Sequence, residues 1–262
     1  MTPQRIGTAD LFSIAGKVAL VTGGSRGIGR MIAQGYVEAG AKVYISSRKA
    51  EACDAAAGAL SELGACVALP EDIATEAGCT RLAQEVARRE NALHVLVNNA
   101  AANWGASIET YPEAAFDKVM STNVKSIFML TRALLPLLER AGRRGDPARV
   151  INIGSIDGLK VPFVDNFAYA ASKAAVHHLT RVLAVKLGAR NIAVNTVAPG
   201  PFESKMTEWM LETFRDQIER ACPLHRIGEP GDMAGVAIYL ASRAAAYVSG
   251  ALLTVDGGLC VT

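Results

Sequence analysis

The sequence predicts an α/β protein built on a doubly wound parallel sheet, and three observations support that fold class. Short β-branched runs alternate with longer segments rich in Ala, Leu, Glu and Arg throughout the 262 residues. A glycine-rich turn follows the first run. The runs extend over the whole chain, which leaves no block of residues for a second domain. We therefore expect a single Rossmann-type domain, with a seven-stranded parallel sheet and helices on both faces.

Seven short apolar runs each have the length of a buried strand. They occupy residues 18–21, 42–45, 66–69, 94–97, 150–153, 192–196 and 252–255. Between them, apolar residues recur at helical spacing. In Arg81–Arg89, for example, Leu82, Ala83 and Val86 fall on one side of the predicted helix.

The connections complete the predicted layout. Thr110 and Glu113 predict a capping box at the start of a long helix that runs toward Gly142. The stretch 199–222 is too long for an ordinary loop, so we expect it to hold short helices that act as a substrate lid. The chain then consists of an N-terminal arm and one domain, residues 1–16 and 17–262. Irregular structure is also expected at residues 142–148 and 157–166.

Composition excludes several classes of protein. Half of the residues are hydrophobic and 20% are charged, which excludes a disordered chain. The net charge of +2 is low for a polyanion binder, so we expect no nucleic acid partner. The sequence begins without the apolar core of a secretory signal, and no stretch approaches the ~18 apolar residues of a membrane span. We therefore expect a soluble, cytoplasmic protein that does not bind membranes.

Cysteine and histidine residues show no metal-binding pattern, so we expect no metal. The five cysteines are scattered and none forms a CxxC pair, which indicates structural thiols in a reducing compartment. His177 and His178 are adjacent and would point to different faces of a helix. For these histidines we expect a role at the surface or at an interface.

The glycine-rich turn predicts a dinucleotide-binding site. It runs from Thr22 to Gly29, and Gly23, Gly27 and Gly29 give a G-x3-G-x-G spacing. Glycines allow the backbone to approach a pyrophosphate, and the helix that begins near Ile28 supplies free N–H groups. The alternative is an ordinary glycine-rich connection, but its position between the first strand and the first helix favours the dinucleotide.

The second strand indicates which dinucleotide binds. An enzyme that binds NAD usually places an acidic residue there to hold the ribose 2′-hydroxyl. Here the strand ends in Ser46, Ser47 and Arg48, with no acid. Arg48, together with Arg26 from the glycine turn, would pair with a 2′-phosphate. We therefore predict NADPH rather than NADH; the alternative is that both arginines are solvated surface residues.

A Tyr–Lys pair predicts the chemistry. Tyr169 and Lys173 are four residues apart, which places them on one face of a helix that follows the strand ending at Ser155. Reduction of a carbonyl needs a proton for the oxygen, and a free tyrosine has a pKa of about 10. A nearby ammonium lowers that pKa, so Lys173 would tune Tyr169 as the general acid. Ser155 would donate a hydrogen bond to the developing oxyanion.

With these features, the chain resembles the short-chain dehydrogenase/reductase family over essentially its full length. Within the family it most resembles NADPH-dependent β-ketoacyl (3-oxoacyl-ACP) reductases, in particular the type associated with rhamnolipid supply. The resemblance implies a catalytic set of Asn123, Ser155, Tyr169 and Lys173, with Asn123 anchoring a water in the proton relay. The motifs that carry it are Thr22–Gly29, Asp72, Asn98-Asn99-Ala100, Asn123, Ser155, Tyr169-Ala-Ala-Ser-Lys173, Pro199-Gly200 and Val255-Asp-Gly-Gly258.

The resemblance also implies where the cofactor would lie. Asp72 and Ile73 would contact the adenine, and Pro199, Gly200 and Phe202 would flank the nicotinamide. The full set of expected cofactor contacts is Gly23, Ser25, Arg26, Gly27, Ile28, Gly29, Ser47, Arg48, Asp72, Ile73, Asn99, Ala100, Tyr169, Lys173, Pro199, Gly200, Phe202 and Ser204.

These observations lead to one main function and two alternatives. The main hypothesis is an NADPH-dependent reductase that converts a 3-oxoacyl thioester, on CoA or acyl carrier protein, to its 3-hydroxyacyl product. The first alternative keeps the chemistry but changes the substrate to a secondary alcohol, a polyol or a small ketone. The second is a non-catalytic regulator that senses the nucleotide.

Three further features concern the substrate pocket, a carrier protein and the assembly, and the first two leave alternatives open. Trp104 and Phe163 would either line an acyl pocket or serve packing. A basic run would either dock an acidic acyl carrier protein or form a solvated face. The family usually pairs helices across subunits, which implies a homotetramer. The basic residues are Arg140, Arg143, Arg144 and Arg149, with Arg190.

Overall fold

A seven-stranded parallel sheet forms the centre of the protein, which is described here for residues 7–262 of a computed structural model. The strand order is β3-β2-β1-β4-β5-β6-β7, and every neighbouring pair is parallel. The order reverses between β1 and β4, the place where doubly wound sheets bind ligands. The predicted fold class is confirmed. The strands are β1 (Val18–Thr22), β2 (Lys42–Ser46), β3 (Cys66–Ala68), β4 (Val95–Asn98), β5 (Ala148–Ile153), β6 (Ile192–Pro199) and β7 (Leu252–Val255).

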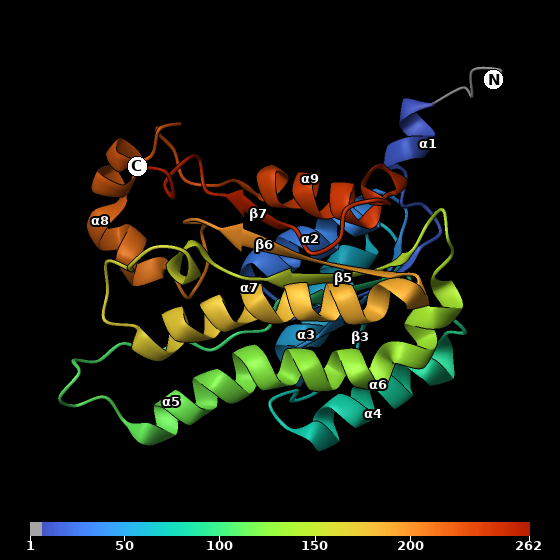
Figure 1. Cartoon of the computed structure of the whole chain (residues 1–262), viewed down its shortest axis with the longest axis horizontal. Helices are drawn as coiled ribbons and strands as arrows, with labels where there is room; N and C mark the ends of the chain where they lie inside the picture. Colours follow the sequence, from blue (N-terminus) through green and yellow to red (C-terminus); the bar gives the residue numbers. More distant parts are fainter. Residues whose placement is uncertain (1–6) are drawn as a thin grey trace.

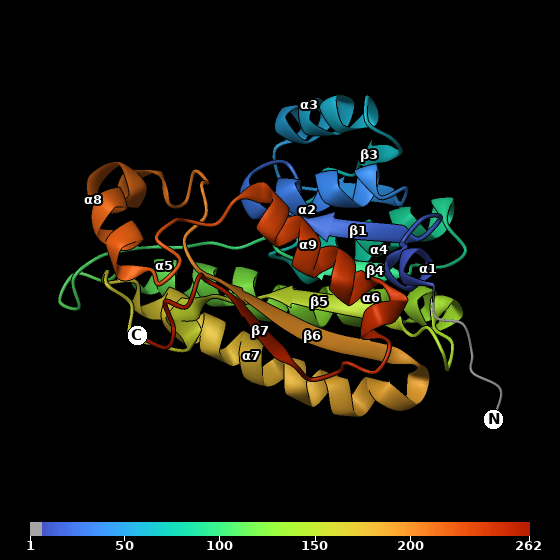
Figure 2. The same cartoon turned by 90° about the horizontal axis from the view of Figure 1, so that it is seen from above.

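Helices cover both faces of the sheet (Figures 1 and 2). One buried cluster joins the sheet to α2, α3 and α9, and another joins it to α4, α6 and α7. Of the predicted arm, residues 1–16, the first six lie outside the described part, and the rest contains the short helix α1. The helices are α1 (Thr8–Phe12), α2 (Gly27–Glu38), α3 (Ala50–Ser61), α4 (Glu76–Arg89), α5 (Glu113–Met120), α6 (Ser126–Ala141), α7 (Phe167–Leu187), α8 (Glu208–Ala221) and α9 (Pro230–Ala241).

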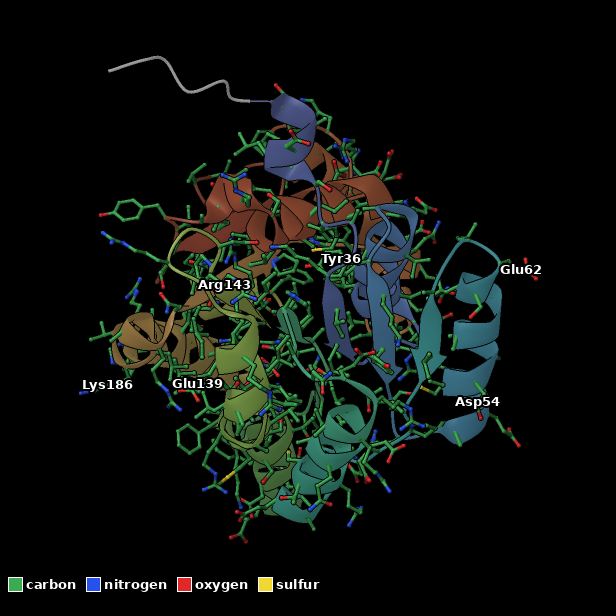
Figure 3. All side chains as sticks on the ribbon, turned by 90° about the vertical axis from the view of Figure 1, so that its right-hand side faces the viewer. Tyr36, Asp54, Glu62, Glu139, Arg143 and Lys186 are labelled. Atoms are coloured by element: carbon green, nitrogen blue, oxygen red, sulfur yellow. The ribbon has the colours of Figure 1, made fainter. Side chains whose placement is uncertain are left out.

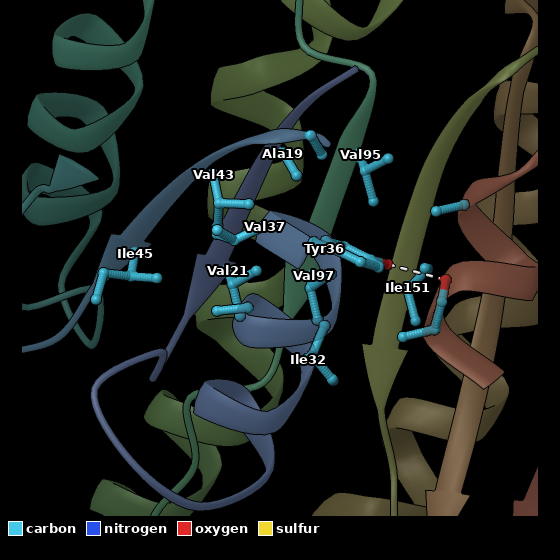
Figure 4. Close-up of a cluster of buried hydrophobic side chains, with 14 of the residues drawn as sticks. Ala19, Val21, Ile32, Tyr36, Val37, Val43, Ile45, Val95, Val97 and Ile151 are labelled. Atoms are coloured by element: carbon cyan, nitrogen blue, oxygen red, sulfur yellow. Dashed lines mark hydrogen bonds between the residues drawn. The ribbon is translucent and has the colours of Figure 1, made fainter. Parts of the chain in front are cut away.

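The core explains why the strand sequences are apolar on both sides. All residues of β1, β4, β5 and β6 are buried, as expected for strands covered on two faces. Figure 4 shows one half of this core, where Tyr36 of α2 reaches across to α9. The Tyr36 hydroxyl donates to the Ala237 carbonyl at 3.0 Å, so the aromatic ring is buried with its polar atom satisfied.

The helical path before Gly142 differs from the prediction at both its start and its middle. The N-cap of α5 is Pro112 and no side chain caps the helix, so the predicted Thr110–Glu113 capping box is wrong. Thr110 lies two residues before the cap, and its hydroxyl instead pairs with that of Ser107 at 3.0 Å. Between α5 and α6 the chain makes a π-helical turn, Ser121–Lys125, of the kind often found at functional sites.

The stretch predicted as a lid is more regular than expected. It contains a single helix of 14 residues, α8, rather than several short ones. Figures 1 and 2 place α8 at the same end of the molecule as the loops that lead into α5 and α7. Within residues 7–262, no helix is both long and apolar enough to cross a membrane, and no three potential metal ligands gather.

The basic run does not form one exposed patch, which supports neither carrier docking nor a solvated face for all of its residues. Arg149 is 1% exposed and pairs with Asp146, and Arg190 pairs with Glu139. Arg143 and Glu139 lie on the right-hand side of the molecule, which faces the viewer in Figure 3, whereas α8 lies at the left in Figure 1. Periodicity could not locate this group because it does not tell which end of a sheet a loop occupies.

Candidate active site

The glycine turn is shaped so that only glycine fits. Gly23 and Gly27 have φ of +67° and +52°, in the left-handed region that glycine tolerates. A Cβ on Gly29 would collide with the Asn99 amide and with the Gly23 carbonyl. The turn opens directly onto the first N–H groups of α2, which begins at Gly27. Such a turn with a free helix N-terminus fits a pyrophosphate.

Asn99 and Thr22 hold this turn against the end of β4. The Asn99 amide donates to the Thr22 carbonyl at 2.9 Å, and the Thr22 hydroxyl accepts the N–H groups of Asn99 and Ala100 at 3.0 and 3.1 Å. The predicted contact residues Asn99 and Ala100 are therefore packed directly beneath the turn. Their side of the site is preformed by hydrogen bonds between β1 and β4.

The end of β2 places two free cations beside the turn. The Ser46 carbonyl accepts the N–H groups of Gly23 and Gly24 at 2.7 and 3.3 Å, which brings the turn against the residues that follow β2. Arg26 and Arg48 are both exposed, and neither forms an ion pair with any residue in the range 7–262. Two unpaired guanidinium groups at this corner fit a 2′-phosphate.

The remaining predicted contacts lie around the same crevice, with one difference. Asp72 is exposed and Ile73 is buried after β3. Ser204 lies against Gly27, whose Cβ would be 3.0 Å from that of Ser204. The Phe202 side chain, by contrast, is 2% exposed and belongs to the core, so it is not available to contact the nicotinamide.

Ser155, Tyr169 and Lys173 converge where β5 ends and α7 begins. Ser155 lies two residues after the end of β5, and the Lys173 ammonium donates to the Ile153 carbonyl at 2.8 Å. The same ammonium lies 5.3 Å from the centroid of the Tyr169 ring. Lys173 is 3% exposed, so its charge acts with little screening by solvent. The helical spacing of four residues therefore does place the pair on one face.

The electrostatics of this pair differ from the prediction. Burial, helped by the charge of Asp157, raises the pKa of Tyr169, while a hydrogen bond with Ser155 opposes the rise. Burial also lowers the pKa of Lys173 to about 8, against the opposing charge of Asp157. The expectation that Lys173 lowers the pKa of Tyr169 is wrong for the protein by itself, because desolvation of the phenol dominates.

Asn123 lies in the π-helical turn and fixes a loop. Its side chain exchanges two hydrogen bonds with the backbone of Ala102, at 2.8 and 2.9 Å, and donates to the Ser172 hydroxyl at 2.9 Å. The amide is 1% exposed and fully engaged. Asn123 thus joins the loop after β4 to α7, one residue before Lys173.

His177 is a site residue that the sequence analysis missed. It is 5% exposed, so the expected surface role is wrong. Its Nε2 accepts the N–H of Ser155 at 3.4 Å and fixes the backbone of that serine. Burial and the neighbouring Lys173 lower its pKa to about 4. The signal was present, because positions 169, 173 and 177 follow one helical face at a spacing of four.

Asp157 and Asn166 were also missed. Asp157 follows Ser155 in a 3₁₀ turn, Ile156–Gly158, and its Oδ2 accepts a hydrogen bond from the Asn166 amide at 3.0 Å. Asn166 comes directly before α7. Two polar residues inside one irregular loop give no periodic signal, so only the folded loop brings these residues to the site.

An aromatic groove adjoins this group. Phe163 stacks edge-on against Phe214 of α8 at 5.3 Å between ring centroids, and Trp209 packs on Phe214 at 5.7 Å. The groove has a volume of about 550 Å³. Phe163 and Trp209 are 78% and 62% exposed, so their rings are available to a ligand. Trp104, which is 46% exposed, is not among the residues that line the groove, which are Gly105, Ala106, Ser107, Phe163, Val164, Asp165, Trp209 and Phe214.

Comparisons with known proteins agree with this geometry. Residues 23–260 match the family described as enoyl-(acyl carrier protein) reductase. The chain is 48% identical over 249 residues to the rhamnolipids biosynthesis 3-oxoacyl-[acyl-carrier-protein] reductase of Pseudomonas aeruginosa, covering 94% of this chain and 97% of that protein. It is 34% identical over 257 residues to gluconate 5-dehydrogenase of Gluconobacter oxydans, covering 97% and 98%.

A solved structure gives the same result in three dimensions. The Pseudomonas aeruginosa RhlG/NADP active-site complex superimposes with a TM-score of 0.93 at 47% identity, covering 96% of this chain and 99% of that one. The chain belongs to the short-chain dehydrogenase/reductase family of oxidoreductases.

Proposed function

We propose that this protein is an NADPH-dependent reductase that converts 3-oxoacyl thioesters to 3-hydroxyacyl products. The observation that carries the substrate class is the aromatic groove between Phe163 and α8, whose lining residue Asp165 comes directly before Asn166 and α7. Its aromatic rings stabilise an acyl tail by burial, and polar side chains, those of Ser107 and Asp165, are a minority of the lining. The relative from Pseudomonas aeruginosa, named as a 3-oxoacyl reductase, supports the same assignment.

Each catalytic residue has one role in the proposed reaction. NADPH, when bound, supplies a hydride for the carbonyl carbon. The Tyr169 phenol donates its proton to the carbonyl oxygen, and the Ser155 hydroxyl donates a hydrogen bond to that oxygen as negative charge develops. The Lys173 ammonium stabilises the tyrosinate that remains and has two further N–H donors for a ribose hydroxyl. Asn123 holds the Ala102 loop, and a water at its turn would return a proton.

The cofactor contacts we propose are those predicted from the sequence, without the side chain of Phe202, which lies in the core. The glycine turn would hold the pyrophosphate, and Arg26 and Arg48 would hold the 2′-phosphate. Replacing Arg48 with Ala should raise the KM for NADPH roughly tenfold while leaving that for NADH unchanged, because one charge-assisted contact is lost. Arg190→Ala, at the other end of the sheet, is the matched control. Equal KM values for NADPH and NADH in the wild type would contradict this assignment.

The decisive test of the substrate class is a comparison of substrates. We expect NADPH oxidation with 3-oxoacyl thioesters, on CoA and on acyl carrier protein, to increase with chain length. Phe214→Ala should reduce kcat/KM for a long chain about tenfold more than for acetoacetyl-CoA. Phe12→Ala, an exposed ring that contacts Tyr239, is the control. Faster turnover of 5-ketogluconate than of any thioester would favour the polyol alternative.

Assembly, location and the lid role of α8 belong to the same proposal. Side chains of α6 and α7 expose apolar surface, with Phe128 at 42% and Val185 at 79%, which supports a homotetramer formed through these helices. Size-exclusion chromatography with light scattering would test the tetramer, and a monomer would contradict it.

The five free cysteines support a reducing, cytoplasmic location. We also propose that α8 moves over the bound substrate as a lid.

A further inference from the structure

A half-buried carboxylate, that of Asp157, acts by its charge on both Tyr169 and Lys173 and has no role in the reaction described above. Asp157 sits in the 3₁₀ turn that follows Ser155. Its N–H donates to the Ser155 hydroxyl at 3.1 Å, and its Oδ2 accepts from the Asn166 amide at 3.0 Å. The carboxylate therefore links the two ends of the loop that separates Ser155 from α7.

Asn166 is committed to this contact. It precedes α7 at the N-cap position, where an asparagine ordinarily accepts from the helix backbone, yet it makes no capping bond. The residue is 2% exposed, and its Oδ1 has no partner within residues 7–262. Burial of an asparagine with one polar atom unsatisfied costs folding free energy. The hydrogen bond to Asp157 is the side-chain interaction that this burial makes possible.

Close packing holds the turn that carries Asp157 against α7. A Cβ on Gly158 would come within 2.6 Å of the Ala174 nitrogen and 2.7 Å of the Lys173 carbonyl carbon. The turn thus rests directly on α7 at the level of the catalytic lysine. The backbone of Asp157 is therefore held close to α7, and the hydrogen bond from the Asn166 amide orients its carboxylate.

Charged and titratable groups face Asp157 from three segments. Tyr169 and Lys173 belong to α7, Lys160 follows the turn, and Cys260 lies in the C-terminal segment. The Lys160 ammonium donates to the Leu259 carbonyl at 2.6 Å, so that cation is also engaged elsewhere. Lys173 is buried and makes no hydrogen bond to a carboxylate in the described chain, which leaves Asp157 as its counter-charge.

We propose that Asp157 is a positioning residue for the reaction: its carboxylate clamps the loop between Ser155 and α7 and supplies the negative charge that faces the Tyr169–Lys173 pair. This inference rests on the proposed reductase function. It adds a residue that acts through Tyr169 and Lys173 rather than on the substrate.

The sign of the effect follows from the charge. An ionised Asp157 raises the pKa of Tyr169 and also raises that of Lys173, so both groups hold their protons to higher pH. Reduction needs the protonated phenol and the ammonium. Whichever group limits the rate at alkaline pH, loss of the carboxylate must move that limit to lower pH.

The test compares Asp157→Asn with the wild type. We expect the alkaline limb of the kcat/KM profile to move about one pH unit lower, the size of effect that a nearby charge has. Asp157→Glu, which keeps the charge, should restore the wild-type limb. Lys160→Gln, which removes a charge that faces Asp157 but not Tyr169, is the matched control and should leave the limb unmoved.

A second readout needs neither cofactor nor substrate, so it separates this inference from the proposed function. The tyrosinate absorbance of the free protein, after subtraction of a Tyr169→Phe background, should titrate at lower pH in Asp157→Asn than in the wild type. Asp157→Ser provides a second neutral variant if the first does not fold. An unmoved limb and an unmoved titration, even with a lower kcat, would overturn the proposal and leave Asp157 a structural residue.

Discussion

Both ends of the sheet bury a cation, but the two cations are held differently. At the amino end, Arg149 is 1% exposed and donates to the carboxylate of Asp146 and to the carbonyls of Leu240 and Ser242. At the carboxyl end, Lys173 is 3% exposed and donates to a single carbonyl. The difference teaches that a satisfied buried charge stabilises the fold, whereas an incompletely satisfied one remains available to a ligand.

The largest effect should come from the phenol beside the incompletely satisfied cation. Tyr169→Phe removes the proton donor, so we expect kcat to fall about 10²–10⁴-fold, the contribution of general acid catalysis. The melting temperature should stay close to that of the wild type, because the ring is kept. Steady-state kinetics and thermal unfolding measure the two. Retention of full activity would exclude Tyr169 as the acid.

The next effect concerns the fully satisfied cation. Arg149→Met removes the guanidinium donors to the Leu240 and Ser242 carbonyls and one partner of Asp146, so we expect a loss of about 3 kcal/mol in the free energy of unfolding. Urea denaturation measures it. Protein that remains folded should keep the wild-type kcat, since this end of the sheet lies away from the site. A drop in kcat that exceeds the unfolded fraction would break the comparison.

Replacement of Lys173 should have the opposite effect, a loss of activity with a gain in stability. Its pKa is about 8 in the folded protein against an ordinary value of 10.5, so the unfolded chain binds this proton more tightly. The resulting penalty is absent above about pH 10.5, grows as the pH falls and is complete below about pH 8. Lys173→Met should therefore abolish activity yet gain about 1–2 kcal/mol of stability at pH 7. Stability measured at pH 7 and pH 10 checks the sign; a loss at pH 7 would contradict it.

The smallest effect is expected at the surface. Arg190 pairs with Glu139, but both side chains are about 40% exposed. Exposed ion pairs are screened by water and contribute little. Arg190→Ala should leave the melting temperature unchanged within error, in contrast to Arg149→Met. A large fall in melting temperature would mean that the difference in exposure does not explain the different contributions of Arg190 and Arg149 to stability.

Much of the site followed from the sequence because its residues are tied to regular elements. Gly23, Gly27 and Gly29 are positioned by a strand and a helix on either side, and Tyr169 and Lys173 by helical periodicity. His177 follows Lys173 at the same spacing of four residues, but the adjacent pair His177–His178 alone does not indicate which of the two is buried. Asp157 and Asn166 could not be predicted, because no period relates two residues on one irregular loop.

Local patterns in the sequence thus determined the fold class, the family and the order of strands and helices along the chain. They could do so because the residues of a buried strand or an amphipathic helix themselves carry its hydrophobic pattern. Tertiary structure alone decided which charges are buried, and with them the direction of the pKa shifts at Tyr169 and Lys173. It also decided that Arg149 belongs to the core and that the aromatic rings of α8 meet Phe163. Burial and long-range contact depend on how distant segments pack together, and a local pattern in the sequence does not contain that information.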